Sequence, residues 1–351
     1  MSESTISGAD TSSYVVPPAG GKARRWWLRG IGALLLALAV LIVVLMYWWS
    51  DEPVAVDVRK QAQARAQERG EQLVPGYITT ATASHLGEFL LDKPGGYLAN
   101  DIAPPGVLMD NMPAFEFGVV LQLRDLALAL RNDFSRSQSQ SVEDPDLREA
   151  LNMFSSEHRK WIFPSTESRF REGVQRLDGY LGRLSDDNDQ DGQFYARADN
   201  LEAYLGLVEK RLGSLSQRLS ASIGQERINT DLAGDANAQQ STPSAGAREV
   251  RTPWLQIDNV FYEARGTTYA LIHILKAIEH DFRPVLEDKN AVISLRQIIR
   301  ELEESQAPIY SPIILNGGGY GFFANHSLVM ANYISRANAA LIDLRKLLER
   351  G

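Results

Sequence analysis

The feature that most constrains the fold of this chain is an uncharged, apolar run near its start, Ile31–Trp49. As an α-helix, a run of this length can cross the hydrocarbon core of a bilayer. The pair Trp26-Trp27 precedes the run and the pair Trp48-Trp49 ends it, and tryptophan is enriched at both surfaces of a membrane. We therefore expect a transmembrane anchor over residues 26–50, with the lipid bilayer as the partner of Ile31–Trp49.

The charges on either side of the run predict its orientation. Four basic residues precede it and two acidic residues follow it: Lys22, Arg24, Arg25 and Arg29, then Asp51 and Glu52. Basic residues that flank a transmembrane helix are enriched on its cytoplasmic side, which is the positive-inside rule. This rule predicts a cytoplasmic N-terminus and an exported C-terminal body. Residues 1–25, which are rich in Ser, Thr, Gly and Pro, are predicted to be a disordered cytoplasmic tail.

An apolar run of this kind has two other interpretations, a cleaved signal peptide and a buried core helix. A cleaved signal peptide has a shorter apolar core and small residues at its cleavage site, whereas this run ends in the bulky residues Met46–Trp49. A core helix of a soluble protein would lack the basic and aromatic flanks. We therefore prefer the membrane anchor to both alternatives.

Composition narrows the classes of partner. The formal net charge is −8, and because residues 1–50 contribute +2, the remainder carries −10. Binding to nucleic acid requires clustered Lys and Arg, so an acidic body argues against nucleic acid as a partner, and equally against electrostatic attraction to anionic lipid. The chain has no Cys, which excludes a disulfide framework and thiolate chemistry.

Beyond the anchor, helical spacing of apolar residues predicts an all-α body with no sustained period-two alternation. Residues 51–103 are predicted as a solvated stalk helix, Val56–Arg69, followed by a short helix; a partner-binding role for Val56–Arg69 is the alternative. Several caps mark helix starts, among them Asp144 before Pro145, and Asn325. A polar, proline-containing stretch then divides the body, giving helical unit 1 (104–225), a linker (226–252) and helical unit 2 (253–351).

The two units show signs of an internal repeat. An offset of 148 aligns matching residues of unit 1 with those of unit 2, in the same order: Pro105, Asp110, Asn111, Gly118, Leu123, Ala129, Asp133 and Phe134 with Pro253, Asp258, Asn259, Gly266, Leu271, Ala277, Asp281 and Phe282. After a gap, Arg197 aligns with Arg336. We therefore predict two related helical units, the second lacking one helix.

The repeat predicts two structural ion pairs. A carboxylate and a guanidinium that recur in apolar units often form a half-buried bidentate bridge. We expect Asp110 to pair with Arg197, and Asp258 with Arg336, or the same residues with exchanged partners. The alternative is that both aspartates are only helix caps.

One segment resembles the start of a calcium loop. Asp187, Asp189 and Asp191 are followed by Gly192, which gives D-x-D-x-D-G between two helices. The twelfth position of the loop should carry a bidentate carboxylate but is Ala198, so we expect an acidic surface turn rather than a functional metal site. No catalytic or cofactor motif is recognised elsewhere in the sequence.

The C-terminal half carries a family resemblance. The segment Phe261–Phe282, the residues from Asn325 to Leu328, and the segment Gln193–Leu201 resemble a bacterial membrane-protein family, domain-of-unknown-function family 2333. The resemblance implies an inner-membrane protein of Gram-negative bacteria with one anchor. It implies no activity, cofactor or catalytic residue.

These observations predict a single-pass inner-membrane protein with a periplasmic helical body. We expect a structural or protein-interaction role in the cell envelope, with another envelope protein or the cell wall as partner. The alternative is an enzyme or small-ligand binder that uses a cleft between the two units. Glu116, Asp110 and Arg265 would then be placed for function.

Overall fold

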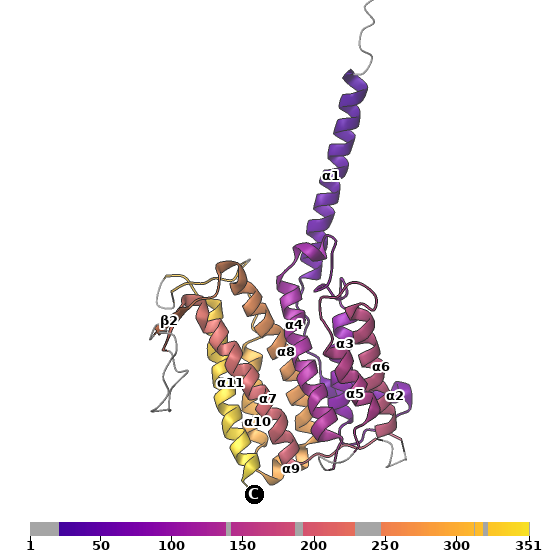
Figure 1. Ribbon diagram of the computed structural model, residues 1–351, viewed down its shortest axis with the longest axis vertical. Coiled ribbons are helices and arrows are strands. Elements are labelled where there is room, and N and C mark those ends of the chain that lie inside the picture. The colour runs from indigo at the N-terminus through magenta and orange to yellow at the C-terminus, as the bar shows by residue number, and fades with distance from the viewer. Residues whose placement is uncertain are drawn as a thin grey trace, which may run out of the picture.

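The structure is a computed structural model that describes residues 21–137, 142–186, 192–228, 247–311, 313–318 and 322–350. Over these residues the fold is helical, which confirms the predicted all-α class. One helix stands away from a body of packed helices (Figure 1). The elements are α1 (Gly21–Trp49), α2 (Val58–Arg69), α3 (Tyr77–Asp92), η1 (Gly106–Leu108), α4 (Asn111–Ala129), η2 (Leu130–Phe134), α5 (Pro145–Phe154), α6 (Thr166–Leu184), α7 (Ala198–Ser220), η3 (Ala221–Ile223), β1 (Gln225–Ile228), β2 (Ala247–Val250), η4 (Trp254–Gln256), α8 (Ile257–Asp281), α9 (Arg283–Asp288), α10 (Val292–Glu304) and α11 (His326–Glu349).

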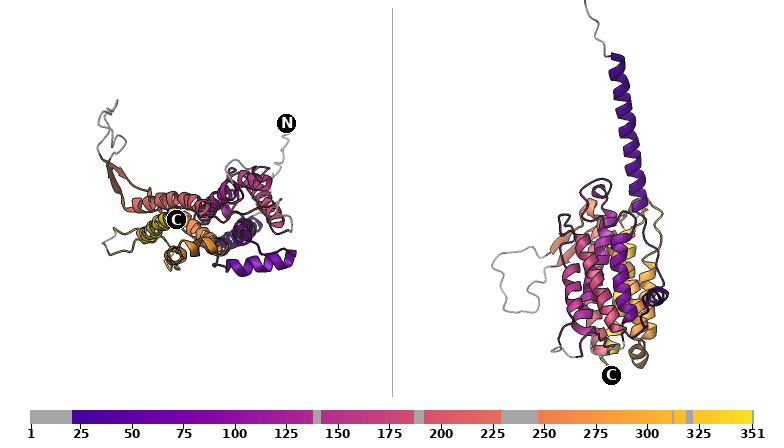
Figure 2. Two further views of the ribbon diagram at one scale, coloured as in Figure 1. Left: turned by 90° about the horizontal axis from the view of Figure 1, so that it is seen from below. Right: turned by 90° about the vertical axis from the view of Figure 1, so that its right-hand side faces the viewer.

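Helix α1 contains, within the described part of the chain, one stretch long and apolar enough to cross a membrane, Trp26–Trp49. None of its most apolar window is buried against the rest of the molecule. The alternative of a buried core helix is therefore wrong. Figure 2 shows α1 rising from the end of the body opposite the C-terminus.

Apart from the short helices α2 and α9, the helices of the body run up and down along a common direction (Figures 1 and 2). Helices α4 and α8 lie side by side at its centre, with α3, α5 and α6 on one side and α7, α10 and α11 on the other. Since successive helices reverse direction, four connections return to the end of the body from which α1 extends. We call this the proximal end; its connections are residues 93–110, 155–165, 251–256 and 305–325, of which 312 and 319–321 are not described. The C-terminus lies at the opposite, distal end (Figure 2).

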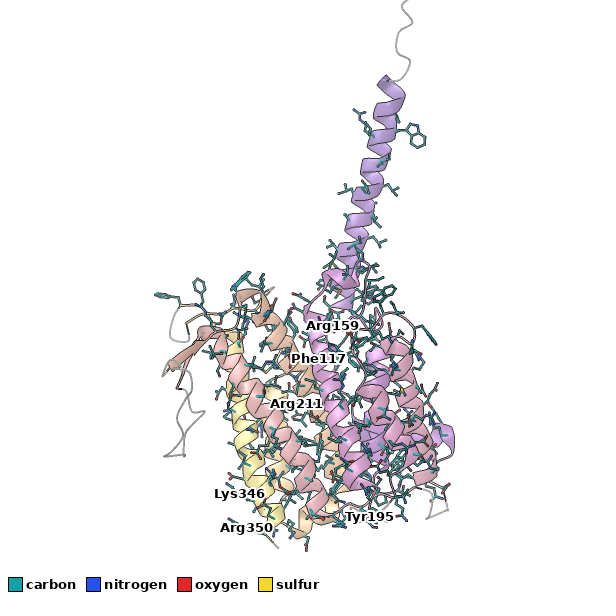
Figure 3. All side chains as sticks on the ribbon, viewed as in Figure 1. Phe117, Arg159, Tyr195, Arg211, Lys346 and Arg350 are labelled. Atoms are coloured by element: carbon teal, nitrogen blue, oxygen red, sulfur yellow. The ribbon has the colours of Figure 1, made fainter. Side chains whose placement is uncertain are left out.

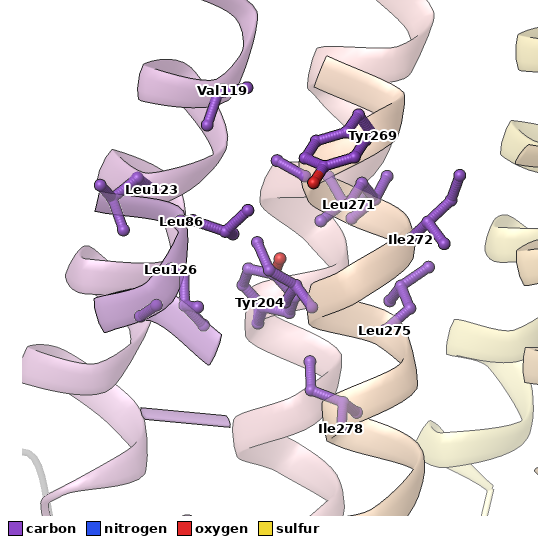
Figure 4. Packing of buried hydrophobic residues seen from close by; sticks show 14 of the residues in the cluster. Leu86, Val119, Leu123, Leu126, Tyr204, Tyr269, Leu271, Ile272, Leu275 and Ile278 are labelled. Atoms are coloured by element: carbon purple, nitrogen blue, oxygen red, sulfur yellow. The ribbon is translucent and has the colours of Figure 1, made fainter. Parts of the chain in front are cut away.

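One hydrophobic core runs through both predicted units, 104–225 and 253–351. Buried side chains of α4, α7 and α8 face one another across it, among them Leu126, Tyr204 and Leu275 (Figure 4). Burial of apolar surface on this scale is the main force that holds such a bundle together.

The backbones of α4 and α8 approach most closely at two glycines. A Cβ atom on Gly266 would lie 1.9 Å from the carbonyl oxygen of Phe115, and one on Gly118 would lie 2.2 Å from the carbonyl oxygen of Glu263. Any larger side chain at either position would therefore push the two central helices apart. Glycine is required here by the close approach of backbone to backbone.

The predicted stalk helix is not solvated, and that prediction is wrong. Helix α2 begins after Asp57, whose carboxylate accepts hydrogen bonds from two backbone amides, and ends at Gly70 in the left-handed conformation. Its buried residues recur every four positions and form one narrow face: Val58, Ala62 and Ala66. This face packs on Tyr77 and Leu181 of the body. The alanines gave no wide apolar stripe in the sequence, but small residues suffice where a helix lies close to its neighbour.

Two other helix starts agree with the predicted caps. The Asp144 carboxylate accepts from the amides of Asp146 and Leu147 at the start of α5, and the Asn325 side chain accepts from Leu328 at the start of α11. At the two ends of the segment predicted as a linker, β1 and β2 pair in antiparallel register. No residue pattern in this segment predicts the short pairing.

Candidate functional site

The most specific construction in the structure is the junction between α1 and the body, residues 50–57, which we call the junction segment. Just before it, the indole of Trp49 packs against the turn after α3 and lies 2.6 Å from where a Cβ on Gly95 would be. Gly95 also has a left-handed φ of 86°. Glycine is therefore favoured there both by the backbone conformation and by the close approach of Trp49. The C-terminal end of α1 therefore packs directly against the body.

A buried guanidinium holds the middle of the junction segment. Arg265 of α8 is only 4% exposed, and its Nε donates to the Glu52 carboxylate at 2.8 Å. Its Nη1 also donates to the carbonyl oxygens of Ser305 and Ala307, at 3.3 and 3.0 Å. Charge-assisted bonds of this kind are short and directional. Arg265 therefore ties the junction segment to both α8 and the connection after α10.

A buried histidine holds the end of the junction segment. The backbone N–H of Val56 donates to Nε2 of His273 at 3.0 Å, and Nδ1 of the same ring lies 2.7 Å from the carbonyl oxygen of Tyr269. Because Nε2 accepts, Nδ1 must carry the proton, so the ring is neutral. Burial lowers the pKa of His273 to about 4, which keeps it neutral at physiological pH.

Helix α2, which follows the junction segment, is fixed by an ion-pair network. Arg65 donates to the carboxylate of Asp178 at 2.5 Å and to that of Glu88 at 3.1 Å, and Arg69 reaches Asp178 at 2.7 Å. The side chain of Arg65 is 14% exposed, so water screens these bonds only in part. The chain between α1 and α3 is thus held along its length.

A cleft of about 740 Å³ opens at the proximal end, where α4 and α8 begin. It is lined by residues of both predicted units, including Asp110 just before α4, Phe117 of α4 and Glu263 of α8. Figure 3 shows Phe117 and Arg159 at this end of the body. Arg218, which also lines the cleft, pairs with Glu263 at 2.5 Å. The cleft has the size of a small-ligand pocket.

The three residues that the cleft hypothesis named do not meet in one place. Asp110 lines the cleft, whereas Arg265 lines a second cavity of about 360 Å³ among α8, α10 and α11. Glu116 is fully buried and accepts from the backbone amides of Leu98 and Ala99, with Lys93 at 2.6 Å. Burial raises the pKa of Glu116 to about 7 even though Lys93 opposes the shift. Its contacts fix the connection after α3.

The ion pairs that form are not the predicted Asp110–Arg197 and Asp258–Arg336 pairs. Arg197 pairs with Asp199 beside it, and Arg336 pairs with Glu301 at 2.6 Å. The reason is chain direction: α7 begins at the distal end, so Arg197 lies at the opposite end of the body from Asp110.

The two aspartates instead lie near each other, because α4 and α8 are parallel and both begin at the proximal end. Burial raises the pKa of Asp258, and the Asp110 carboxylate raises it further. The side chain of Asp110 makes no capping hydrogen bond at the start of α4. The weak calcium-loop residues Asp187, Asp189 and Asp191 lie outside the described residues.

Sequence reasoning missed Glu52, Trp49 and His273 as junction residues. In the sequence, Glu52 and Trp49 stand out only as flanks of the apolar run, and His273 belongs to no metal-binding or catalytic motif. Nothing local to these residues signals the contacts, because each contact joins positions more than two hundred residues apart or a turn to a helix end. Arg265 was named, but for the cleft.

Comparisons with known proteins identify the family of this chain. No curated protein and no solved structure matches the chain. The model of one family, described as an uncharacterized protein conserved in bacteria (DUF2333), matches residues 21–351. This match begins where α1 begins and covers the body to its last residue. The chain therefore belongs to the family of uncharacterised bacterial proteins DUF2333.

Proposed function

We propose that this protein is a single-pass component of the bacterial inner membrane whose helical body is held in the periplasm directly at the membrane surface. The observation that carries the proposal is the junction segment. An exposed apolar helix ends in Trp49, and the next residues are fixed to the body through Arg265 and His273. A signal sequence destined for removal would have no need of such an attachment.

The proposed orientation follows from charge. Lys22, Arg24, Arg25 and Arg29 precede the apolar run Ile31–Trp49, while the Glu52 carboxylate that pairs with Arg265 follows it. Positive charge on the cytoplasmic side places the body across the membrane.

We propose a structural or protein-interaction role for the body, with another envelope protein as partner. The buried acids support this role because their contacts maintain the fold. Glu116 accepts from the backbone of Leu98 and Ala99, and Asp281 accepts from the amide of Thr79 at 2.7 Å at the start of α3. Groups engaged in this way hold segments together.

Three measurements test the proposal. A C-terminal fusion to an alkaline phosphatase that is active only after export should be active, and a fusion to a reporter that works only in the cytosol should be inactive; the reverse pattern would refute the topology. The intact mass of the membrane-extracted protein should include residues 1–49, and loss of this mass would show a cleaved signal peptide.

Crosslinking in cells followed by affinity capture should recover an envelope protein; a body that stays monomeric and uncrosslinked would contradict the interaction role.

The cleft supports a second candidate function, binding of a small ligand between α4 and α8. Its volume of about 740 Å³ and its lining from both units support this candidate. Native mass spectrometry of the purified chain should then show a bound small molecule that Arg159→Ala removes. Arg171→Ala, an exposed arginine outside the cleft, serves as the matched control and should retain the molecule. Detection of the bare chain alone in the unsubstituted protein would count against this function.

A further inference from the structure

The large apolar side chains exposed on the body gather at one end of it. Among the described residues, those at the proximal end and in the junction segment are Val54, Ile102, Val107, Leu108, Trp161, Ile162, Phe163, Ile223, Trp254, Leu255, Tyr310, Ile313, Phe322, Phe323 and Val329. Those at the distal end are Leu73, Val142 and Ile293. The exposed aromatic residues of the body that the structure describes in this group are all proximal. Exposed apolar surface concentrated in this way marks a contact surface.

The side chains come from different connections that lie next to one another. Asn100 Nδ2 donates to the carbonyl oxygen of Lys160 at 3.1 Å, which joins the connection after α3 to the one that carries Trp161 and Phe163. Val107, Arg159 and Gln256 all line the cleft. The turn at Trp254 therefore lies beside the connection after α3 and the connection after α5. The apolar side chains thus project from adjoining loop tips.

The junction segment fixes the position of these loops relative to the end of the transmembrane anchor α1. Trp48 and Trp49 end the apolar run, and the indole of Trp49 rests on the turn at Gly95, in the first of the proximal connections. Arg265 joins Glu52 to Ala307, close to Tyr310. If Trp48 and Trp49 mark the membrane interface, as aromatic residues at the end of a transmembrane helix do, the proximal loops lie at the same level.

We propose that the proximal end of the body is a membrane-contacting surface whose aromatic loop tips enter the headgroup–acyl boundary of the leaflet that α1 leaves. This inference rests on the proposed anchoring by α1 and extends it from the helix to the body. The aromatic residues carry the contact: Trp161, Phe163, Trp254 and Tyr310 are each more than half exposed. Amphipathic rings of this kind prefer the interface between lipid and water.

The occupant of the surface is the bilayer because the surface lies at the end of the body from which α1 extends and continues the aromatic end of that helix (Figure 1). The binding is apolar: the body is acidic, so attraction to anionic headgroups does not drive it. Contact through several loops as well as α1 would hold the body in one orientation, with the cleft between α4 and α8 opening at the membrane surface.

Single-cysteine labelling tests the inference cleanly, since the chain contains no native Cys. An environment-sensitive fluorophore is placed on Phe163→Cys and Tyr310→Cys, from two different proximal loops, in the full chain reconstituted into vesicles of phosphatidylethanolamine and phosphatidylglycerol. Ile293→Cys is the matched distal control, because Ile293 is 81% exposed and Phe163 is 85% exposed. Leu36→Cys reports separately whether α1 lies in the bilayer. Quenching by nitroxide-bearing lipid is compared with quenching by iodide in the water.

The expected result is that labels at Leu36, Phe163 and Tyr310 emit at shorter wavelength and are quenched by the lipid nitroxide, whereas the label at Ile293 is quenched by iodide alone. Lipid quenching at Leu36 with iodide quenching at Phe163 and Tyr310 would overturn the inference and leave the anchor intact. Iodide quenching at Leu36 would overturn the anchor itself. A proximal label shielded from both quenchers would overturn the inference in favour of a protein interface, and loss of the shielding on dilution would identify a second copy as its occupant.

Discussion

The crossing of α4 and α8 provides a quantitative test of the claim that one core joins the two halves of the body. In Gly266→Ala, the added methyl group would lie 1.9 Å from the carbonyl oxygen of Phe115 and 2.7 Å from its carbonyl carbon. Both neighbours are backbone atoms of a central helix, so no side chain can rotate away. Restoring an ordinary contact of 3.4 Å requires the 1.9 Å distance to grow by about 1.5 Å. A gap of even about 0.5–1 Å between packed surfaces forfeits about a quarter to a half of the dispersion energy across it.

The size of the effect follows from two opposing contributions. Alanine is a better helix former than glycine by about 1 kcal/mol, which favours the substitution. Overpacking a filled core typically costs about 1–3 kcal/mol and costs more when the backbone must move. Because the clash is backbone against backbone, we expect the upper part of that range, and a net loss in the free energy of unfolding of about 2 kcal/mol or more.

The assay is equilibrium denaturation of the detergent-solubilised full chain, followed by far-ultraviolet circular dichroism. Gly213→Ala is the matched control: it makes the same change inside α7, where the nearest atom to the added methyl group is a side-chain nitrogen of Asn338 at 3.7 Å. Gly213→Ala should be neutral or should stabilise the chain by up to about 1 kcal/mol. Equal effects of the two substitutions would refute the close approach of α4 and α8.

Three further predictions concern polar contacts. Arg65→Ala should release α2, with faster hydrogen exchange in residues 58–69 and unchanged exchange in α4; uniform protection in both would contradict the ion-pair attachment. His273 has a pKa of about 4 when folded and about 6.5 when unfolded, so the unfolded chain binds more protons between these values, and stability should fall as pH drops from 6.5 to 4, by up to about 3 kcal/mol. His273→Gln, which can still accept from Val56, should flatten this part of the stability–pH curve, and an unchanged slope would refute the assignment. Arg211→Met should cost about 2 kcal/mol in denaturation, because it leaves the buried carboxylate of Asp125, which Arg211 contacts at 2.6 Å, without its partner; no loss would mean that solvent replaces the pair.

Local patterns predicted the helical class and several helix starts. The carboxylate of Asp144 before a proline, and the side chain of Asn325 before an apolar spacing of three and four, are signals that depend on neighbouring residues alone. The structure places a cap at each of them. The apolar run was equally clear, because its length and lack of charge need no tertiary information.

What the sequence did not show depends on long-range packing. Helix α2 was predicted to be solvated because Ala62 and Ala66 offer little apolar area, yet small residues allow the closest contact between helices. The predicted Asp110–Arg197 pair was wrong because the alignment matched residues without the direction of α7, and Arg336 pairs with Glu301 of α10 instead of Asp258. Gly118 and Gly266 were matched in the proposed repeat, and the structure brings these two positions together at the crossing of α4 and α8. The repeat itself remains a prediction.

The claim on which the whole account depends is that α1 and the body form one rigid unit through the junction segment. Its most direct test is the distribution of distances between spin labels on Tyr47→Cys, in the exposed last turns of α1, and Ile293→Cys, at the distal end, measured by pulsed electron resonance in the full chain in lipid nanodiscs. We predict a single narrow distribution, which broadens when Arg265→Ala and His273→Ala are combined. A distribution already broad in the unsubstituted junction, as a flexible linker produces, would contradict the account.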